Sequence, residues 1–239
     1  VLARNDTGFR NLTKLSSYSH SKGFYYRPRI DKAILEKHSE GLVVMSGCLQ
    51  GEQASYIRND RFDDALASAK KMKELFGDNF YIELMDNGMP EQKAVMKELI
   101  ELARRLNIKT VATNDVHYSL KNDAVVQDIA LAIGTRSTLD DPKRPKLSTQ
   151  EFYLKTGDEM FEIFREVPEA LNTTLEIAEK CNVAIDFDQL RLPAYDPPKG
   201  FDSFTYLKSL CEKGIPARYG KKTKAVSDRM AMELDVIKS

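Results

Sequence analysis

The sequence lacks several features that would assign the protein to a particular class. It has no Trp, and its three cysteines, Cys48, Cys181 and Cys211, are an odd number spread widely along the chain. Without a recognisable signal peptide, such cysteines indicate a reducing compartment and not a disulfide framework. No apolar run approaches the roughly 18 residues that a membrane helix needs. We therefore expect a cytoplasmic protein with no membrane partner.

Net charge is also lacking, because 36 Lys and Arg balance 36 Asp and Glu. The whole-chain charge therefore gives no argument for nucleic acid or a membrane surface as a partner. The first 40 residues differ, with eight basic residues against four acidic ones, which is typical of a solvated basic surface. Within them, the FYYRPR segment (24–29) has two interpretations. Its rings and arginines could stack on a nucleic-acid strand, or the arginine stems could pack over the tyrosine rings.

The middle of the chain alternates between two hydrophobic patterns. Compact apolar runs predict strands at 41–46, 80–85 and 108–113, and helical spacing predicts helices at 61–76 and 90–106. Helical crossovers between short apolar strands imply a parallel sheet or a barrel. In such folds the chemistry lies at the carboxyl ends of the strands.

The rest of the chain is predicted to be mainly helical. Further helices are expected at 30–38, 123–134, 157–182 (two, broken at Pro168), 202–219 and 224–238. A Pro-rich connector suggests three parts: a first region at 1–185, the connector at 186–201, and a helical region at 202–239. The chain starts with VLARND, without Met and in the manner of a strand interior, so we expect it to be a piece of a longer protein.

The stretch ATNDVHY (112–118) places a carboxylate and an imidazole where the last predicted strand ends. Asp115 and His117 are two positions apart on an extended backbone, so their side chains should point the same way. Such a pair can bind Zn²⁺, Mn²⁺ or Fe²⁺, or form a general-base pair. Alternatively, Asn114 or Asp115 caps the next helix. The sequence leaves these three alternatives open.

Cys48 follows another predicted strand, in a turn flanked by glycines. A thiolate, an imidazole and a carboxylate at neighbouring strand ends would form a mixed metal-ligand set. The alternative is that Cys48 is a small buried apolar residue. Glu52 and Glu83 are either additional ligands or partners of His117, or they make backbone hydrogen bonds. The remaining candidates are predicted to be structural cysteines or surface histidines: Cys181, Cys211, His20 and His38.

Six blocks, in order, resemble the alpha subunits of bacterial DNA polymerase III, the C-family of replicative polymerases. They are GLVVMSGCLQGE, FYIELMDNGMPEQ, VATNDVHY, LSTQEFYLKTGDEM, NTTLEIAEKCNV and LKSLCEKGIPARYG. The resemblance runs along the whole chain and implies an N-terminal polymerase-and-histidinol-phosphatase (PHP) domain fragment. It implies an α/β fold: a partial PHP-type distorted (β/α)7 barrel without its first strands, then a mainly helical segment leading into the polymerase core.

The resemblance also implies a metal site. The family's last ligand motif, Asp-x-His, matches Asp115 and His117, and Cys48 is similar in position to a Cys or His ligand. A divalent metal (Zn, Mn or Fe) would bind there, with Mg serving the parent polymerase. The family's other ligand motifs are expected upstream of Val1, and its catalytic aspartates downstream of Ser239. We therefore expect this chain alone to be inactive in both reactions.

The resemblance supports one main functional hypothesis and two alternatives. The chain would belong to a DNA-directed DNA polymerase, a nucleotidyltransferase, whose PHP region supports 3′–5′ exonuclease or phosphoesterase chemistry. Its partners would be primer–template DNA and other replicase subunits. In the first alternative, the region is a non-catalytic module that stabilises the polymerase or docks a proofreading exonuclease subunit. A free-standing phosphatase of small phosphomonoesters is the second, against which the long helical tail argues.

Overall fold

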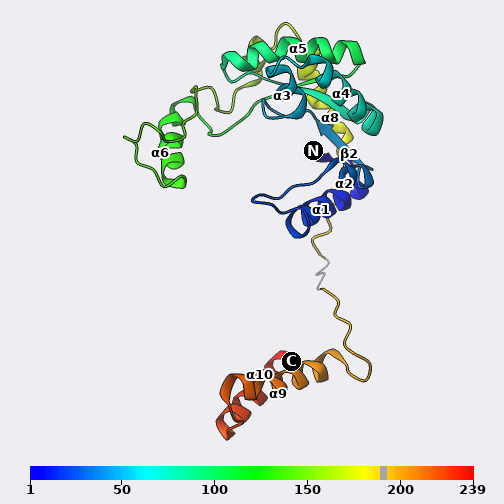
Figure 1. Cartoon of the computed structure of the whole chain (residues 1–239), viewed down its shortest axis with the longest axis vertical. Helices are drawn as coiled ribbons and strands as arrows, with labels where there is room; N and C mark the ends of the chain where they lie inside the picture. The colour runs from blue at the N-terminus through cyan, green and yellow to red at the C-terminus, as the bar shows by residue number, and fades with distance from the viewer. Residues whose placement is uncertain (189–192) are drawn as a thin grey trace. The chain divides into compact units, whose positions relative to one another are not determined.

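The computed structural model describes residues 1–188 and 193–239. They form two compact units, Val1–Ile185 and Asp186–Ser239, which are drawn in Figure 1. The described part of the predicted connector contains no helix or strand, and its residues 189–192 lie outside the described residues. Among the helices that the structure describes, none is both long and apolar enough to span a membrane.

A four-stranded sheet forms the centre of the first unit. Its strands are neighbours in the order β1 (Leu2–Ala3), β2 (Leu42–Met45), β3 (Phe80–Met85) and β4 (Thr110–Thr113). β1 is antiparallel to β2, whereas β2, β3 and β4 are parallel. The predicted α/β class and its parallel sheet are therefore confirmed. The (β/α)7 barrel is not confirmed, because the described residues form a four-stranded sheet and no closed barrel.

Helices connect and cover these strands. Those of the first unit are α1 (Asp6–Ser21), α2 (Lys32–Lys37), α3 (Glu52–Arg58), α4 (Phe62–Phe76), α5 (Pro90–Leu106), α6 (Ala124–Gly134), α7 (Gly157–Ile163) and α8 (Glu169–Lys180), with the 3₁₀ turns η1 (Gly77–Asn79) and η2 (Lys121–Asp123). The helices expected at 61–76, 90–106 and 123–134 agree with α4, α5 and α6 to within one residue. Pro168 lies directly before α8, where the sequence predicts a break.

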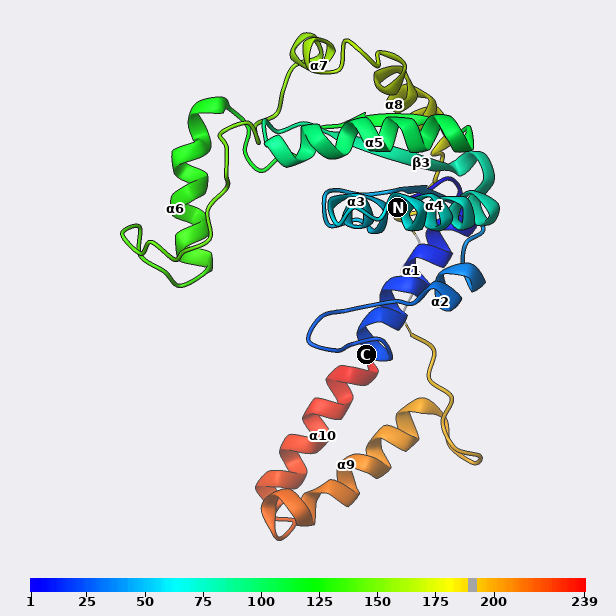
Figure 2. The ribbon, with the colours of Figure 1, turned by 45° about the horizontal axis from the view of Figure 1, so that its top comes forward.

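Both faces of the sheet are covered, which explains its uninterrupted apolar strands. Val44 belongs to the main core with residues of α4 and α5, whereas its neighbour Val43 packs with Tyr81, Val111 and Ile177 on the opposite face. Ile177 comes from α8. Successive strand residues point to opposite faces, so a sheet covered on both sides buries each of them. Figure 2 shows α5 running beside β3.

Helix α1 is not predicted by the hydrophobic pattern. Its buried residues are Gly8, Asn11 and Leu15, so only one of the three is a large apolar residue. Asn5 caps the helix by accepting a hydrogen bond from the Gly8 amide at 3.0 Å. Gly8 also allows a close approach, because a Cβ there would lie 1.9 Å from the carbonyl oxygen of Gly41. The helix is therefore placed against β2 by a backbone contact that only glycine permits.

The two ends of the first unit meet beside β1. The main-chain amide of Asn182 donates to the carbonyl oxygen of Arg4 at 2.8 Å. The amide of Ala184 donates to the carboxylate of Asp6 at 3.3 Å, across 178 positions of sequence. The segment that follows α8 therefore lies against the beginning of the chain.

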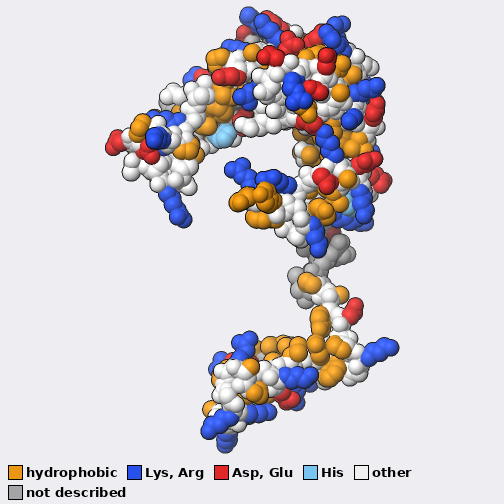
Figure 3. Space-filling view, in the orientation of Figure 1, with side chains coloured by type: hydrophobic (Ala, Val, Ile, Leu, Met, Phe, Trp, Pro, Cys, Tyr) orange, Lys and Arg blue, Asp and Glu red, His pale blue; other side chains and the backbone are white. Residues whose placement is uncertain are grey.

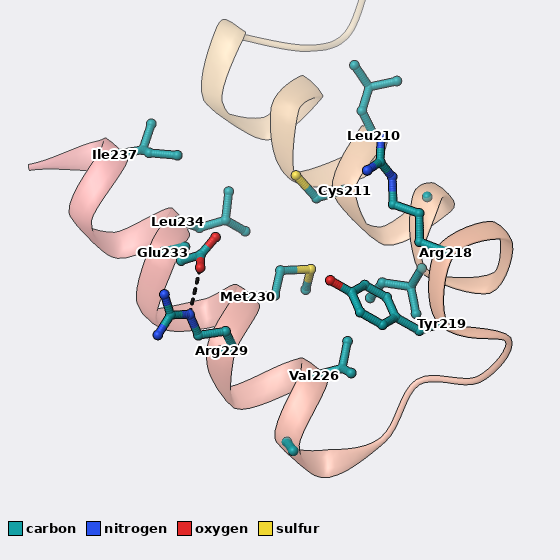
Figure 4. A pocket seen from close by; sticks show the side chains of 13 residues that line it. Leu210, Cys211, Arg218, Tyr219, Val226, Arg229, Met230, Glu233, Leu234 and Ile237 are labelled. Atoms are coloured by element: carbon teal, nitrogen blue, oxygen red, sulfur yellow. Dashed lines mark hydrogen bonds and ion pairs between the residues drawn. The ribbon is translucent and has the colours of Figure 1, made fainter.

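The second unit contains α9 (Ser203–Tyr219) and α10 (Lys224–Lys238), close to the two helices predicted there. A mainly apolar groove of about 630 Å³ lies between them. Figure 4 shows Cys211 of α9 and Met230 of α10 among its lining residues. Cys211 is half-buried, which fits a structural role.

Candidate functional site

Asp115 and His117 lie just beyond β4, at the carboxyl end of the parallel strands. The Nε2 atom of His117 is 3.3 Å from Oδ1 of Asp115, and the two side chains are 38% and 41% exposed. The side chains therefore point the same way, as the two-residue spacing predicts. Both remain open to solvent, so a metal ion or a substrate group can approach them.

The backbone around this pair is held by the segment that precedes α7. The His117 amide donates to the carbonyl oxygen of Phe152 at 2.8 Å. The Asn114 side chain donates to the carbonyl oxygen of Tyr153 at 3.1 Å. The His117 ring packs edge-on against the Phe152 ring, with 5.2 Å between centroids. These contacts fix the orientation of the imidazole from a segment some 35 residues further along the chain.

The buried side chain of Asn87 connects the segment of Asp115 to the segment before α7. This residue is 1% exposed, and its side-chain amide donates to the carbonyl oxygens of Asp115 at 3.2 Å and Glu151 at 3.0 Å. The main-chain carbonyl oxygen of Asn87 accepts from the Thr149 hydroxyl at 2.6 Å. The side chain of the buried Gln92 accepts from the main-chain amide of Asn87 at 2.7 Å. It also donates to the side-chain oxygen of Asn87 at 3.3 Å. Sequence reasoning missed Asn87, because an Asn-Gly pair signals only a turn.

The helix-cap interpretation of Asn114 and Asp115 is wrong. The next helical turn, η2, has Leu120 as its N-cap residue, and Asp123 inside the turn accepts from the Leu120 amide at 3.0 Å. Asn114 is instead bonded to the segment before α7. A local cap was expected because Asn and Asp are common before helices. Here the carboxylate that bonds the start of the turn comes from Asp123, inside the turn itself.

Glu83 connects the ends of the three parallel strands. Its carboxylate accepts from the Gly47 amide at 3.1 Å and from the Thr113 hydroxyl at 2.7 Å. The Glu83 amide in turn donates to the Ser46 hydroxyl at 2.9 Å. Of the roles predicted for Glu83, the structure shows the backbone hydrogen bond. Glu52 forms an ion pair with Lys32 at 2.6 Å.

Cys48 lies in the turn after β2, exposed and with a free thiol. It borders a small hollow together with Gly47 and Glu83. Within residues 1–188 and 193–239, no group of three or more His, Cys, Asp or Glu residues is close enough to hold a metal ion. The structure thus brings Asp115 and His117 together but does not add Cys48 to them. The metal role of all three remains a prediction.

The chemistry of the pair fits part of a metal site. A carboxylate oxygen and an imidazole nitrogen are both ligands of Zn²⁺, Mn²⁺ and Fe²⁺. Their separation of 3.3 Å allows both atoms to contact one ion. A complete site needs three or four protein ligands. The residues described here supply two at this position, so they fit a partial site only.

A cluster of charged residues surrounds the segment that holds the pair. Tyr153 donates to the Glu159 carboxylate at 2.5 Å, and this bond together with burial raises the pKa of Tyr153 to about 12. The Lys155 side chain is 2% exposed and donates to the carbonyl oxygen of Glu151, and burial lowers its pKa. Lys121 pairs with Glu151 at 2.7 Å, which raises the pKa of Lys121. The charges of this cluster are therefore largely neutralised in pairs.

The other candidate residues lie away from the pair or on the surface. Cys181 ends α8 and packs against the apolar cluster on the second face of the sheet. His20 is exposed near the end of α1, and His38 is half-buried after α2. In the 24–29 segment, Arg29 lies over the Tyr25 ring at 5.2 Å, as the packing interpretation predicts. The rings themselves are nevertheless exposed.

Comparison with known proteins shows what the chain is similar to. Residues 1–87 match the PHP domain family. The chain is 44% identical to DNA polymerase III subunit alpha of Treponema pallidum over 239 residues, which cover 99% of this chain and 20% of that protein. It is similar to DNA polymerase III subunit alpha. The corresponding protein of Borreliella burgdorferi is 43% identical over 99% of the chain and 21% of the relative. That of Thermus aquaticus is 41% identical over 92% of the chain and 18% of the relative.

The resemblance to DNA polymerase III alpha subunits inferred from the sequence blocks is therefore confirmed. The chain spans about a fifth of the length of the curated relatives it matches. The PHP match contains Cys48, Glu83 and Asn87 and ends before Asp115. The similarity to the alpha subunits covers Asp115 and His117 as well, because it includes 99% of the chain.

Proposed function

We propose that the chain acts in DNA replication as the PHP region of a replicative DNA polymerase alpha subunit. The observation that carries this proposal is the 44% identity over 99% of the chain. Residues 1–185 would belong to the PHP barrel, and 202–239 would begin the polymerase core, with 186–201 as a connector. The partners would be primer–template DNA and other replicase subunits in the cytoplasm.

A chimera tests this role. The segment replaces the matching part of the Thermus aquaticus alpha subunit, to which it is 41% identical. We expect primer extension within several-fold of the parent enzyme, with Mg²⁺ supplied. A second chimera that carries Gly8→Ala, which disturbs the contact of α1 with Gly41, serves as the matched control and should extend less. A folded chimera without primer extension would contradict the proposal.

Within this region, Asp115 and His117 would be two ligands of a divalent metal, with Cys48 as a further candidate. The 3.3 Å contact between the two side chains supports the pairing. When bound, such a metal polarises a phosphodiester and activates water for 3′–5′ exonuclease or phosphoesterase chemistry. The chain's own contribution is positional. The bonds from His117 to Phe152 and from Asn87 to Asp115 hold the two donor atoms toward the same point.

Elemental analysis tests the metal proposal directly. Zn, Mn and Fe are measured in this chain and in a full-length alpha subunit that contains it. We expect metal in the full-length protein, and a loss of at least about ten-fold in metal affinity in the Asp115→Asn, His117→Ala double variant. Asp63→Asn with His38→Ala changes an exposed acid on α4 and a histidine after α2, and should leave the metal content unchanged. Unchanged metal in the first variant would reject the two ligands.

One observation favours a second candidate function, a non-catalytic module. The residues on either side of Asp115 are bonded to the segment before α7, so the loop has a structural role whether or not a metal binds. The region would then stabilise the polymerase or dock a proofreading exonuclease subunit. In that case the Asp115→Asn, His117→Ala variant keeps nuclease activity unchanged. Deletion of 1–185 from the full-length subunit would instead lower its melting temperature or its affinity for the exonuclease subunit.

A further inference from the structure

The loop between α1 and α2 exposes three consecutive aromatic rings. Phe24, Tyr25 and Tyr26 are 58%, 63% and 80% exposed. Aromatic side chains normally lie inside a protein or against a partner, so a contiguous exposed set marks an interaction surface. In Figure 3 hydrophobic side chains gather at this loop with basic side chains beside them. We refer to residues 22–29 as the aromatic loop.

The aromatic loop carries positive charge only. It contains Lys22, Arg27 and Arg29 and no Asp or Glu. Within the described residues none of these three side chains forms an ion pair. Some other exposed basic residues of the first unit, such as Lys32, are paired with carboxylates. The free charges of the loop therefore remain available to an anionic partner.

The backbone of the loop is closed and defined. The carbonyl oxygen of Arg29 lies so near Gly23 that a Cβ there would be 1.9 Å from it. Above this crossing, the Tyr25 amide donates to the carbonyl oxygen of Arg27 at 3.1 Å. Tyr26 at the tip has a φ of +58°, which is unusual for a residue with a side chain. The loop thus presents its rings from a fixed base.

The rings and the positive charges lie side by side. Tyr25 and Tyr26 lie edge to face with 4.6 Å between centroids, and Arg29 lies over Tyr25 at 5.2 Å. Proteins that hold single strands combine exposed rings, on which bases stack, with cations that contact phosphates. Consecutive rings beside arginines fit a strand that offers both bases and phosphates.

We propose that the aromatic loop binds single-stranded nucleic acid, with bases stacked on Tyr25 and Tyr26 and phosphates bound by Lys22, Arg27 and Arg29. This inference deepens the proposed function, because it gives the strand a binding place on the same region. It does not depend on the metal pair, since none of the loop residues is a candidate ligand. The two proposals can therefore fail separately.

Fluorescence anisotropy with a labelled oligothymidylate tests the loop. The assay contains EDTA, so that metal binding plays no part. For the Tyr25→Ala, Tyr26→Ala variant we expect affinity to fall about five-fold or more. For Arg27→Ala with Arg29→Ala, the slope of log affinity against log salt should flatten by about 1.4. Phe161→Ala, which removes a 51% exposed ring on α7, and Lys70→Ala with Lys71→Ala on α4 are the matched controls.

Equal losses in the loop variants and the controls would overturn the proposal, because they would show a diffuse electrostatic attraction. Circular dichroism verifies that each variant folds. A second measurement uses the unaltered protein: an oligonucleotide with 5-iododeoxyuridine is photo-crosslinked, and the adduct is located by mass spectrometry. We expect adducts on Phe24, Tyr25 or Tyr26. Adducts confined to other segments would overturn the proposal even if a variant does not fold.

Discussion

The side-chain amide of Asn87 lies 3.2 Å from the main-chain oxygen of Asp115, to which it donates a hydrogen bond. Asn87 follows the end of β3 and Asp115 follows the end of β4, so this bond ties together two neighbouring strand ends. The same amide reaches Glu151, which places the segment before α7 in the same network. The candidate metal pair therefore rests on a buried polar residue that does not itself face the site.

Replacement of Asn87 by Ala should destabilise the first unit by about 2–3 kcal/mol, because it removes three hydrogen bonds and leaves the carbonyl oxygen of Asp115 and the side-chain NH₂ of Gln92 without this partner. Urea unfolding followed by circular dichroism measures the change. Asn59→Ala is the control, since Asn59 is exposed and bonds only locally to Ser55. A change of less than about 0.5 kcal/mol for Asn87→Ala would contradict the structural role of this network.

Glu176 should make stability depend on acid pH. Hydrogen bonds from Lys109 and Lys180 lower the pKa of Glu176 from 4.5 to about 2 in the folded protein. Because the folded pKa is the lower one, this stabilisation is present above pH 4.5 and is lost as the pH falls toward about 2. We expect Glu176→Gln to lower the urea midpoint at pH 7 more than at pH 3. The exposed Glu74→Gln variant should show no such difference between the two pH values.

The contact of Gly8 with Gly41 should not tolerate a methyl group. A Cβ at Gly8 would lie 1.9 Å from the carbonyl oxygen of Gly41, so Gly8→Ala must move α1 away from β2. We expect a loss of about 1–3 kcal/mol in the free energy of unfolding. Gly134→Ala at the end of α6 has open space around it and should be neutral or slightly stabilising. Similar effects of the two substitutions would argue against the close packing of α1.

Cys48 should be the first thiol to react. It is exposed, whereas Cys181 and Cys211 are half-buried. A thiol reagent such as 5,5′-dithiobis(2-nitrobenzoate) should show one fast phase that disappears in Cys48→Ser and persists in Cys181→Ser. In a metal-loaded full-length subunit the same phase should slow if Cys48 is a ligand. A fast phase that survives Cys48→Ser would show that another cysteine is the accessible one.

The sequence predicts those helices and strands whose buried residues are apolar. In α5, buried Val95, Leu99 and Leu102 lie at helical spacing, and the predicted bounds agree with the structure. In α1 a glycine and an asparagine occupy two of the three buried positions, so no apolar stripe exists to be found. The short α3 is also missed, because its buried residues include Gln53. A hydrophobic pattern cannot predict a helix whose buried positions hold polar side chains that form hydrogen bonds inside the protein.

The candidate site is predictable to the extent that it is local. Two residues on one extended segment must point the same way, so the Asp115–His117 contact follows from spacing alone. The position of Cys48 relative to them depends on the turn after β2, which the sequence does not define. Asn87 is harder still, since its partners Asp115 and Glu151 lie 28 and 64 residues away. Nothing near Asn87 in sequence signals those bonds.

The contact between the segment after α8 and β1 determines the order in which the first unit can be completed. Arg4 is synthesised long before Asn182, yet its carbonyl oxygen bonds to that residue. Closing so long a loop is slow relative to forming the neighbouring pair β3 and β4 with α5 between them. β1 and α1 can therefore pack on β2 early, but the bonds that Arg4 and Asp6 accept must wait until the segment after α8 has been synthesised. A ribosome that pauses before residue 182 would hold a chain in which β1 is paired with β2 but still lacks the cover of this segment.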